Sequence, residues 1–201
     1  MLAFWRWAVA AERATTNPAA GLPRVKPAPP RPRPAPEIVY RESLSRAGKR
    51  ERLMLRLAAE AGLRRAEVAQ VHTRDVVEDL GGYSLSVRGK GGKVRTVPLS
   101  DSLAAELRQY VGKRRGFAFP GDDDGHLSPR WVGKLITQLM PGVWTMHTLR
   151  HRFGTRAYMV DRDVFAVQEL LGHASPATTR AYVEMPRDAL RRTVAEVGRI
   201  A

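Results

Sequence analysis

A proline-rich basic segment divides the chain and constrains its fold more than any other feature. Residues 21–36 hold 7 of the 14 prolines, four basic residues and no acidic residue. Proline restricts φ and lacks a backbone N–H, so this composition disfavours helices and strands and is typical of an extended linker. A proline-rich ligand for a partner domain is the alternative, but a position between two apolar segments already explains a linker.

The parts on either side of this linker differ in size. Phe4, Trp5 and Trp7 put a large apolar surface on one short helix, which has nothing within the first twenty residues to bury it against. The stretch is far shorter than the ~20 residues of a membrane helix and lacks the layout of a secretory signal. We interpret residues 1–20 as the last helix of an N-terminal domain and residues 37–201 as a domain of ordinary size.

The charge balance points to a polyanionic partner. Lys and Arg total 34 against 20 Asp and Glu, which gives a formal charge of +14. Of the basic residues 28 are Arg and 6 are Lys, and the planar guanidinium suits forked contacts with phosphate oxygens. Codon bias is an alternative explanation of that ratio, although it leaves the charge unchanged.

The absence of cysteine excludes thiol catalysis, disulfides and cysteine-ligated zinc. It leaves the redox compartment open, and we expect a cytoplasmic location by default, with no membrane partner. The acidic run at residues 122–124 could attract a divalent ion, but flanking glycines favour a solvated loop.

Apolar periodicity predicts a mainly α fold with a small antiparallel β-sheet, in the α+β class. Met54, Leu57 and Ala61 recur at helical spacing, and Gly62 then ends the run, so Arg64 falls between two helices.

Residues 83–87 alternate in polarity, residues 89–92 supply turn residues and residues 94–99 are extended, which predicts a hairpin. Lys90 lies at its tip. Residues 117–128 are expected to form a loop, and helical stripes resume on both sides of it. The stripe after the loop is predicted to consist of Trp131, Leu135 and Leu139.

Two short stretches near the C-terminus carry residues suited to chemistry. His147, Arg150 and His151 share one face of a predicted helix, where a histidine and an arginine can converge on one phosphate. Histidines four apart also fit helical zinc ligands, but Thr148 stands where a zinc protease has glutamate. Further along, His173 follows a helix that ends at glycine.

Tyr182 lies in the next predicted helix, nine residues after His173. Taken alone, a half-buried tyrosine on a short helix is usually structural, so the case for chemistry depends on the motifs together. They are Gly62-Leu63-Arg64 with Glu67, Gly89-Lys90-Gly91-Gly92-Lys93 before Val97-Pro98-Leu99, His147-x-x-Arg150-His151, Leu171-Gly172-His173 and Tyr182.

In order and spacing this series resembles that of the tyrosine recombinases of the phage integrase type. Each string is common alone, but five in order are very improbable by chance, and the resemblance covers residues 37–201. It implies the recombinase catalytic-domain fold and a DNA integrase that acts through a 3′-phosphotyrosyl intermediate, without metal or cofactor. The implied catalytic residues are Arg64, Lys90, His147, Arg150, His173 and Tyr182.

The chemistry suits this set. A phenol is a poor nucleophile at neutral pH, so Tyr182 needs a base, for which His147 or a water it orients is the candidate. Arg64 and Arg150 can stabilise charge on the phosphate, with His173 as a further donor.

Lys90 takes the family's role of general acid, with Lys93 as the alternative. Glu67 can aim Arg64, although an ordinary surface pair fits equally well, and His151 is expected beside the catalytic groups.

Double-stranded DNA is the expected partner, bound by a homotetramer. In the family the tail after Tyr182 packs on a neighbouring protomer, and packing on its own core is the alternative. The residues expected to contact DNA outside the catalytic set are Lys93, Arg95, Arg24, Lys26, Arg31 and Arg33.

Two other functions stay open. We expect only the last helix of the family's N-terminal core-binding domain here, which favours a truncated, non-catalytic DNA-binding remnant. A type IB topoisomerase shares the tyrosine chemistry, but the motifs at Arg150 and His173 favour the integrase side. The target sequence cannot be read from the motifs, because base contacts come from other residues.

Overall fold

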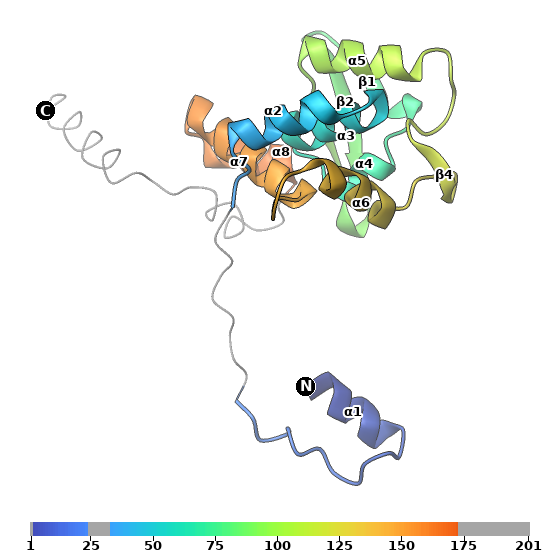
Figure 1. Cartoon of the computed structure of the whole chain (residues 1–201), viewed down its shortest axis with the longest axis vertical. Helices are drawn as coiled ribbons and strands as arrows, with labels where there is room; N and C mark the ends of the chain where they lie inside the picture. The colour runs from blue at the N-terminus through green and yellow to red at the C-terminus, as the bar shows by residue number, and fades with distance from the viewer. Residues whose placement is uncertain (1, 24–32, 173–201) are drawn as a thin grey trace, which may run out of the picture. The chain divides into compact units, whose positions relative to one another are not determined.

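The computed structural model describes residues 2–23 and 33–172 (Figure 1). The chain falls into two units that divide at Pro30 and Arg31. In the first unit, helix α1 (Leu2–Ala10) exposes the rings of Phe4 and Trp7. Among the described helices, none is long and apolar enough to cross a membrane.

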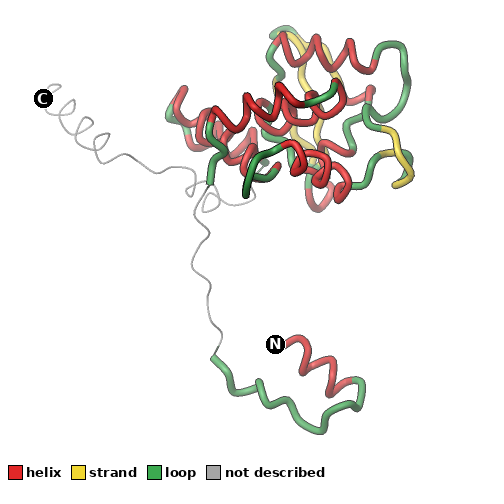
Figure 2. The backbone as a smooth tube through the Cα atoms, viewed as in Figure 1, coloured by secondary structure: helices red, strands yellow, loops and turns green. Residues whose placement is uncertain are grey.

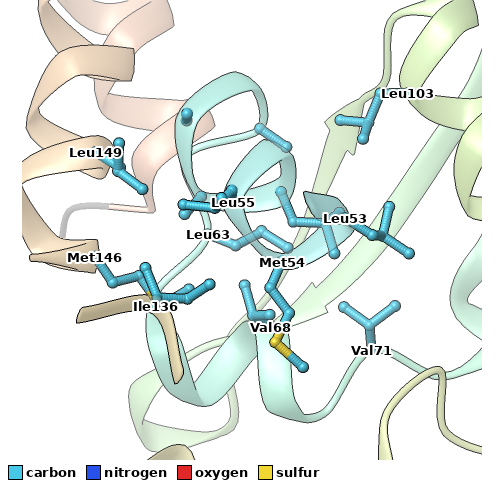
Figure 3. Packing of buried hydrophobic residues seen from close by; sticks show 14 of the residues in the cluster. Leu53, Met54, Leu55, Leu63, Val68, Val71, Leu103, Ile136, Met146 and Leu149 are labelled. Carbon is cyan, nitrogen blue, oxygen red and sulfur yellow. The ribbon is translucent and has the colours of Figure 1, made fainter. Parts of the chain in front are cut away.

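Helix α3 (Lys49–Glu60) is the centre of the second unit. Leu53, Met54, Leu55 and Leu57 are fully buried, and they cover more than one face of the helix. A helix that is apolar on most sides must be covered on most sides. Figure 3 shows side chains of α4, α6 and α7 meeting those of α3.

Helices α2 (Glu37–Arg46), α5 (Asp101–Val111) and α7 (Met146–Asp161) pack on α3. Ser100 begins α5 by accepting a hydrogen bond from the Leu103 N–H. Helices predominate in the described chain (Figure 2).

A glycine ends α3 and aims the chain into the next helix. Gly62 has φ of +65°, and a Cβ there would overlap the Phe153 ring, so both the backbone and the packing require glycine. Arg64 follows in an extended conformation, directly before α4 (Arg65–Ala69). This is the helix junction that the sequence predicts for Arg64.

The sheet has three antiparallel strands, β1 (Val76–Asp79), β2 (Gly82–Arg88) and β3 (Val94–Pro98), in that order. The predicted hairpin corresponds to β2 and β3, and β1 adds a strand beside it. Leu85 pairs with Val97, and both are buried. Two short 3-10 helices, Thr73–Asp75 and Lys90–Gly92, precede β1 and connect β2 to β3.

Two sequence predictions for residues 117–139 need correction. The expected loop contains strand β4 (Pro120–Asp123), which makes only isolated bridges to His126 within the described chain. In α6 (Pro129–Leu139), Val132 and Ile136 are fully buried, Leu135 and Leu139 pack partly buried against the core, and Trp131 is 44% exposed, so the buried stripe is centred one residue later than predicted.

Helix α8 (Val164–Leu171) brings the described chain back to the sheet. Asp163 begins it by accepting hydrogen bonds from the N–H groups of Phe165 and Ala166, and Gly172 ends it in the left-handed conformation. Its carboxyl end contacts β3. The mainly α fold with a small antiparallel sheet is confirmed, and it assembles the site from α4, β3, α7 and the end of α8.

Candidate active site

Arg64 is fixed at its backbone and at its guanidinium by one carboxylate. Its N–H donates to Glu67 Oε2 at 2.8 Å and its Nη1 donates to Glu67 Oε1 at 2.7 Å. The Arg64 side chain is 36% exposed, so the guanidinium still reaches solvent. The glutamate therefore aims a cation that remains available to a ligand.

Glu67 is contacted by arginines from three elements. Besides Arg64, Arg95 on β3 makes a forked pair with it, at 2.8 Å to Oε1 and 2.9 Å to Oε2. Arg150 on α7 brings Nη1 to 3.8 Å from Oε2. The Glu67 side chain is 3% exposed, which argues against an ordinary surface pair.

The electrostatics of Glu67 follow from these partners. Burial by itself raises the pKa of Glu67, but hydrogen bonds from Arg95 and from the backbone and side chain of Arg64 outweigh it, and the pKa falls to about 2. The carboxylate is ionised at neutral pH. Three guanidinium groups around one carboxylate leave the cluster with a surplus of positive charge.

Arg150 connects two turns that are distant in sequence. Its Nη1 donates to the carbonyl of Gly62 and its Nη2 to the carbonyl of Leu171 at 2.5 Å. Its side chain is almost fully buried. The second arginine of the predicted set is thus held rigidly, between the α3–α4 turn and the end of α8.

The carboxyl end of α8 receives one arginine on each of three successive carbonyls. The last carbonyls of a helix lack partners within it and carry partial negative charge, so cations are favoured there. His173, a predicted phosphate donor, follows this end directly. The three bonds are Arg95 Nε to Leu170 O at 2.9 Å, Arg150 Nη2 to Leu171 O at 2.5 Å and Arg64 Nη2 to Gly172 O at 3.3 Å.

His147 and His151 meet edge to face on one side of α7, with ring centroids 4.3 Å apart and an interplanar angle of 79°. Partial burial, together with the charges of Arg150 and Arg64, lowers the pKa of His147. Burial, with the charges of His147 and Arg150, lowers the pKa of His151 to about 4. Neutral imidazoles are therefore favoured, which suits a base at His147.

A cleft of about 830 Å³ opens beside these groups. His147, Arg64 and Arg150 line it, and none of its described lining residues is acidic. Sequence reasoning missed three of its five Lys and Arg residues. A hint was the spacing of two of them, one turn apart on a predicted helix, but basic residues are too common in this chain to single them out. The missed residues are Arg65, Arg130 and Lys134.

The remaining residues that the sequence predicts for catalysis or DNA contact lie outside the described lining of the cleft. Lys90 begins the turn between β2 and β3, and Lys93 is exposed in the same turn. Arg33 lies over the ring of Trp144, at 4.6 Å from its centroid. Arg95, expected on the DNA-facing surface, is instead directed inward, because its guanidinium satisfies Glu67 and the end of α8. Outside the described residues lie Arg24, Lys26, Arg31, His173 and Tyr182, together with the tail after Tyr182.

The acidic run at residues 122–124 is exposed, as the sequence predicts, but its first two residues belong to β4 rather than to a loop. Within residues 2–23 and 33–172, no three His, Cys, Asp or Glu side chains form a group that could hold a metal ion.

Comparison with known proteins identifies the family. Residues 37–187 match the phage integrase family. The tyrosine recombinase XerC of Xanthomonas campestris pv. campestris is 34% identical over 200 residues, which cover 90% of this chain and 60% of that protein. The tyrosine recombinase XerD of Caulobacter vibrioides is 30% identical over 190 residues, with 81% and 62% covered.

Solved structures agree with this match. The integrase from mycobacterium phage Brujita is 32% identical, with a TM-score of 0.66 over 94% of this chain and 66% of that chain. The XerA recombinase is 25% identical, with a TM-score of 0.66 over 88% and 68%. A lambda integrase dimer bound to a core site, 20% identical with a TM-score of 0.66 over 90% of this chain and 56% of that chain, shares the fold.

The chain therefore belongs to the phage integrase family and has the fold of a tyrosine recombinase catalytic domain. It spans about 60% of the length of the XerC relatives that it matches.

Proposed function

We propose that this chain is the catalytic part of a site-specific tyrosine recombinase, which cleaves and rejoins double-stranded DNA. One observation carries the proposal: Arg64, before α4, and His147 and Arg150, on α7, line one cationic cleft without an acidic residue among its described lining. Such a cleft suits a phosphodiester, because fixed cations stabilise the charge that grows on its oxygens.

The proposed reaction is an exchange of two bonds at phosphorus. The Tyr182 oxygen attacks the phosphate, the bond from phosphorus to the 5′ oxygen breaks, and a 3′-phosphotyrosyl link forms. His147, whose pKa is lowered, accepts the phenol proton directly or through water, and Lys90 gives a proton to the departing 5′ oxygen. Rejoining reverses these steps with a 5′ hydroxyl from another strand.

The two arginines have different accessibility in this proposal. Arg64 is partly exposed and already aimed by Glu67, so it is the cation most ready to clamp a non-bridging oxygen. Arg150 is buried and presents its charge from the cleft wall. Losing one such donor costs ~3–4 kcal/mol in the transition state, so Arg64→Ala is expected to slow cleavage by two to three orders of magnitude.

The surrounding cations are proposed to hold the DNA backbone. Arg65, Arg130 and Lys134 line the cleft, and Lys93 and Arg33 are exposed on the surface. Phosphate contacts of this kind give salt-dependent, sequence-independent affinity. We further propose that four copies act together, with two strand exchanges on each pair of duplexes, as the family resemblance implies.

The test is formation of a covalent protein–DNA adduct on nicked half-site DNA, detected after denaturation. Tyr182→Phe should abolish the adduct, whereas Tyr83→Phe, a ring-preserving change in β2, should leave it intact. A chelator should have no effect, because the mechanism uses side-chain cations.

Each alternative has its own signature. Salt-sensitive DNA binding by the wild-type chain without any adduct would favour the non-catalytic DNA-binding remnant. Relaxation of supercoils without a product from paired sites would favour a topoisomerase. An adduct that persists in Tyr182→Phe would overturn the assigned nucleophile.

A further inference from the structure

We infer that Arg95 is a positioning residue for the proposed reaction: it holds Glu67 in the orientation that aims Arg64, and it does so from inside the protein rather than by touching DNA. This inference rests on the proposed function. It assigns to Arg95 a role different from the DNA contact that its charge and its place near the hairpin tip suggest.

Every nitrogen of the Arg95 guanidinium donates a hydrogen bond to another protein group. Nη1 and Nη2 donate to the two oxygens of Glu67 at 2.8 and 2.9 Å, and Nε donates to the Leu170 carbonyl at 2.9 Å. The side chain is only 10% exposed. Each of the three nitrogens therefore donates to a protein acceptor, and with the side chain 10% exposed little of the guanidinium is open to a phosphate.

The strand register places Arg95 where an apolar residue would be expected. In β3, Val97 is buried and residues 94 and 96 are exposed, so residues 95 and 97 point toward the interior. A charged side chain at an inward position is costly unless it is paired. Arg95 meets that requirement through Glu67, which indicates that the pair is a specific feature of this site.

Glu67 transmits the position of Arg95 to Arg64. Glu67 Oε1 accepts from both Arg95 Nη1 and Arg64 Nη1, and Oε2 accepts from both Arg95 Nη2 and the Arg64 backbone N–H. Each carboxylate oxygen is thus shared between the two arginines. Without Arg95, the carboxylate would keep its bonds to Arg64 but lose the forked pair that fixes its plane.

Close packing ties Arg95 to two segments that lead into predicted catalytic residues. Gly172, which precedes His173, has no room for a side chain, because a Cβ there would lie 2.8 Å from Arg95 Cδ. Gly89, which precedes Lys90, is close to the end of the same side chain: a Cβ there would be 3.8 Å from Arg95 Nη1. The Arg95 side chain therefore packs against both segments.

The experiment uses Arg95→Lys and Arg95→Met in the full chain. Lysine keeps the charge but cannot form a planar fork, and methionine keeps much of the apolar stem. The rate of adduct formation is measured in a single turnover on nicked DNA with protein in excess, beside the DNA Kd at several salt concentrations. A positioning role predicts a rate about tenfold to a hundredfold lower in both variants, since misplacing one clamp costs part of its effect.

The DNA Kd separates this role from the rival ones. A positioning role predicts a Kd within about twofold of wild type and an unchanged salt slope, because no phosphate contact is lost. A weaker Kd with a shallower salt slope would make Arg95 a DNA contact and overturn the inference. A normal rate per folded molecule with lower thermal stability would make it merely structural, which also overturns it.

Two further variants serve as controls for the adduct rate and the DNA Kd. Arg130→Met removes a cation that lines the cleft and is expected to raise the Kd and reduce the salt slope. Arg108→Lys changes an arginine that lies over the Tyr83 ring, 4.4 Å from its centroid, and should leave both rate and Kd unchanged.

The route through Arg64 is tested by combining substitutions. If Arg95 acts through Arg64, the penalty of Arg95→Met is much smaller in an Arg64→Ala background than in wild type. Independent penalties that multiply in full would overturn this route.

A readout without catalysis keeps the inference separate from the proposed function. The Nε–H signal of Arg64, assigned by its loss in Arg64→Lys, is followed by ¹⁵N NMR in the free protein. It should shift or broaden in both Arg95 variants and stay unchanged in Arg108→Lys. If the wild type forms no adduct, the proposed function fails, whereas an Arg64 signal unaffected by Arg95→Met overturns the positioning inference.

Discussion

Two glutamates of this chain each meet three arginines, but in opposite surroundings. Glu67 pairs with Arg64, Arg95 and Arg150 and has a side chain that is 3% exposed. Glu37, at the start of α2, is 43% exposed. Its arginine partners are Arg41, Arg152 and Arg156.

The two clusters contain the same kinds of residue, and the burial of the glutamate decides how each cluster behaves. The hydrogen bond from Arg152 lowers the pKa of Glu37 and outweighs the opposing effect of burial, and a hydrogen bond from Arg41 lowers it further. Burial opposes ionisation of Glu67, so its partners must overcome a desolvation cost before they lower its pKa to about 2. The exposed cluster joins α2 to α7, whereas the buried one creates a rigid cationic wall beside the cleft.

Breaking the buried cluster should have the largest effect. Glu67→Gln removes the negative charge while leaving three guanidinium groups together, so we expect a loss of ~3–5 kcal/mol in the free energy of unfolding. Urea unfolding measures this, with Glu37→Gln as the matched change in the exposed cluster. Equal losses for the two variants would contradict the role assigned to burial.

Lowering the pH should remove the contribution of Glu67 to the stability of the fold over a defined pH range. Its pKa falls from the ordinary 4.5 to about 2 on folding, so its stabilisation is complete above pH 4.5 and disappears as the pH falls toward 2. At about 1.4 kcal/mol per pKa unit this amounts to ~3 kcal/mol. The stability difference between wild type and Glu67→Gln should therefore be constant from pH 7 to 5 and shrink below pH 4.5.

His151 should control how stability depends on pH over a separate, less acidic range. Its folded pKa of about 4 lies below the ordinary 6.5, so the unfolded chain takes up a proton first and stability falls as the pH drops from 6.5 to 4. Between pH 7 and 5 we expect a loss of up to about 2 kcal/mol. Thermal unfolding of His151→Phe should show a flatter profile over this range, and a profile as steep as wild type would contradict the assignment.

Substitution of Glu37 should cause the smallest loss of stability. Glu37→Gln is expected to cost about 1 kcal/mol at low salt, because its pairs with the exposed Arg41 and Arg156 are screened by water. At 1 M NaCl, where the screening length is about 3 Å, the cost should fall to the part that comes from Arg152, whose side chain is 8% exposed. Unfolding of both glutamate variants at the two salt concentrations provides the comparison, and a salt-insensitive loss for Glu37→Gln would show that its cluster behaves as a buried one.

Local patterns in the sequence were enough for the fold class and for the shape of the site's segments. Gly62 predicts the end of a helix, because glycine readily adopts the left-handed conformation found there. The alternation of polar and apolar residues around Leu85 indicates a strand even when the neighbouring strands are unknown. The order of short motifs was enough for the family, because each motif is a local string. The roles of Lys90, His173 and Tyr182 stay predictions.

Only the tertiary structure decided which groups meet. In α6 two apolar series run one residue apart, and periodicity alone cannot say that Val132 and Ile136, rather than Trp131, face the core. Arg95 looks like any basic surface residue in the sequence, since its partners Glu67 and Leu170 lie 28 and 75 residues away. The energy of a charge depends on its partners and its exposure to water, and both are set by contacts between distant segments.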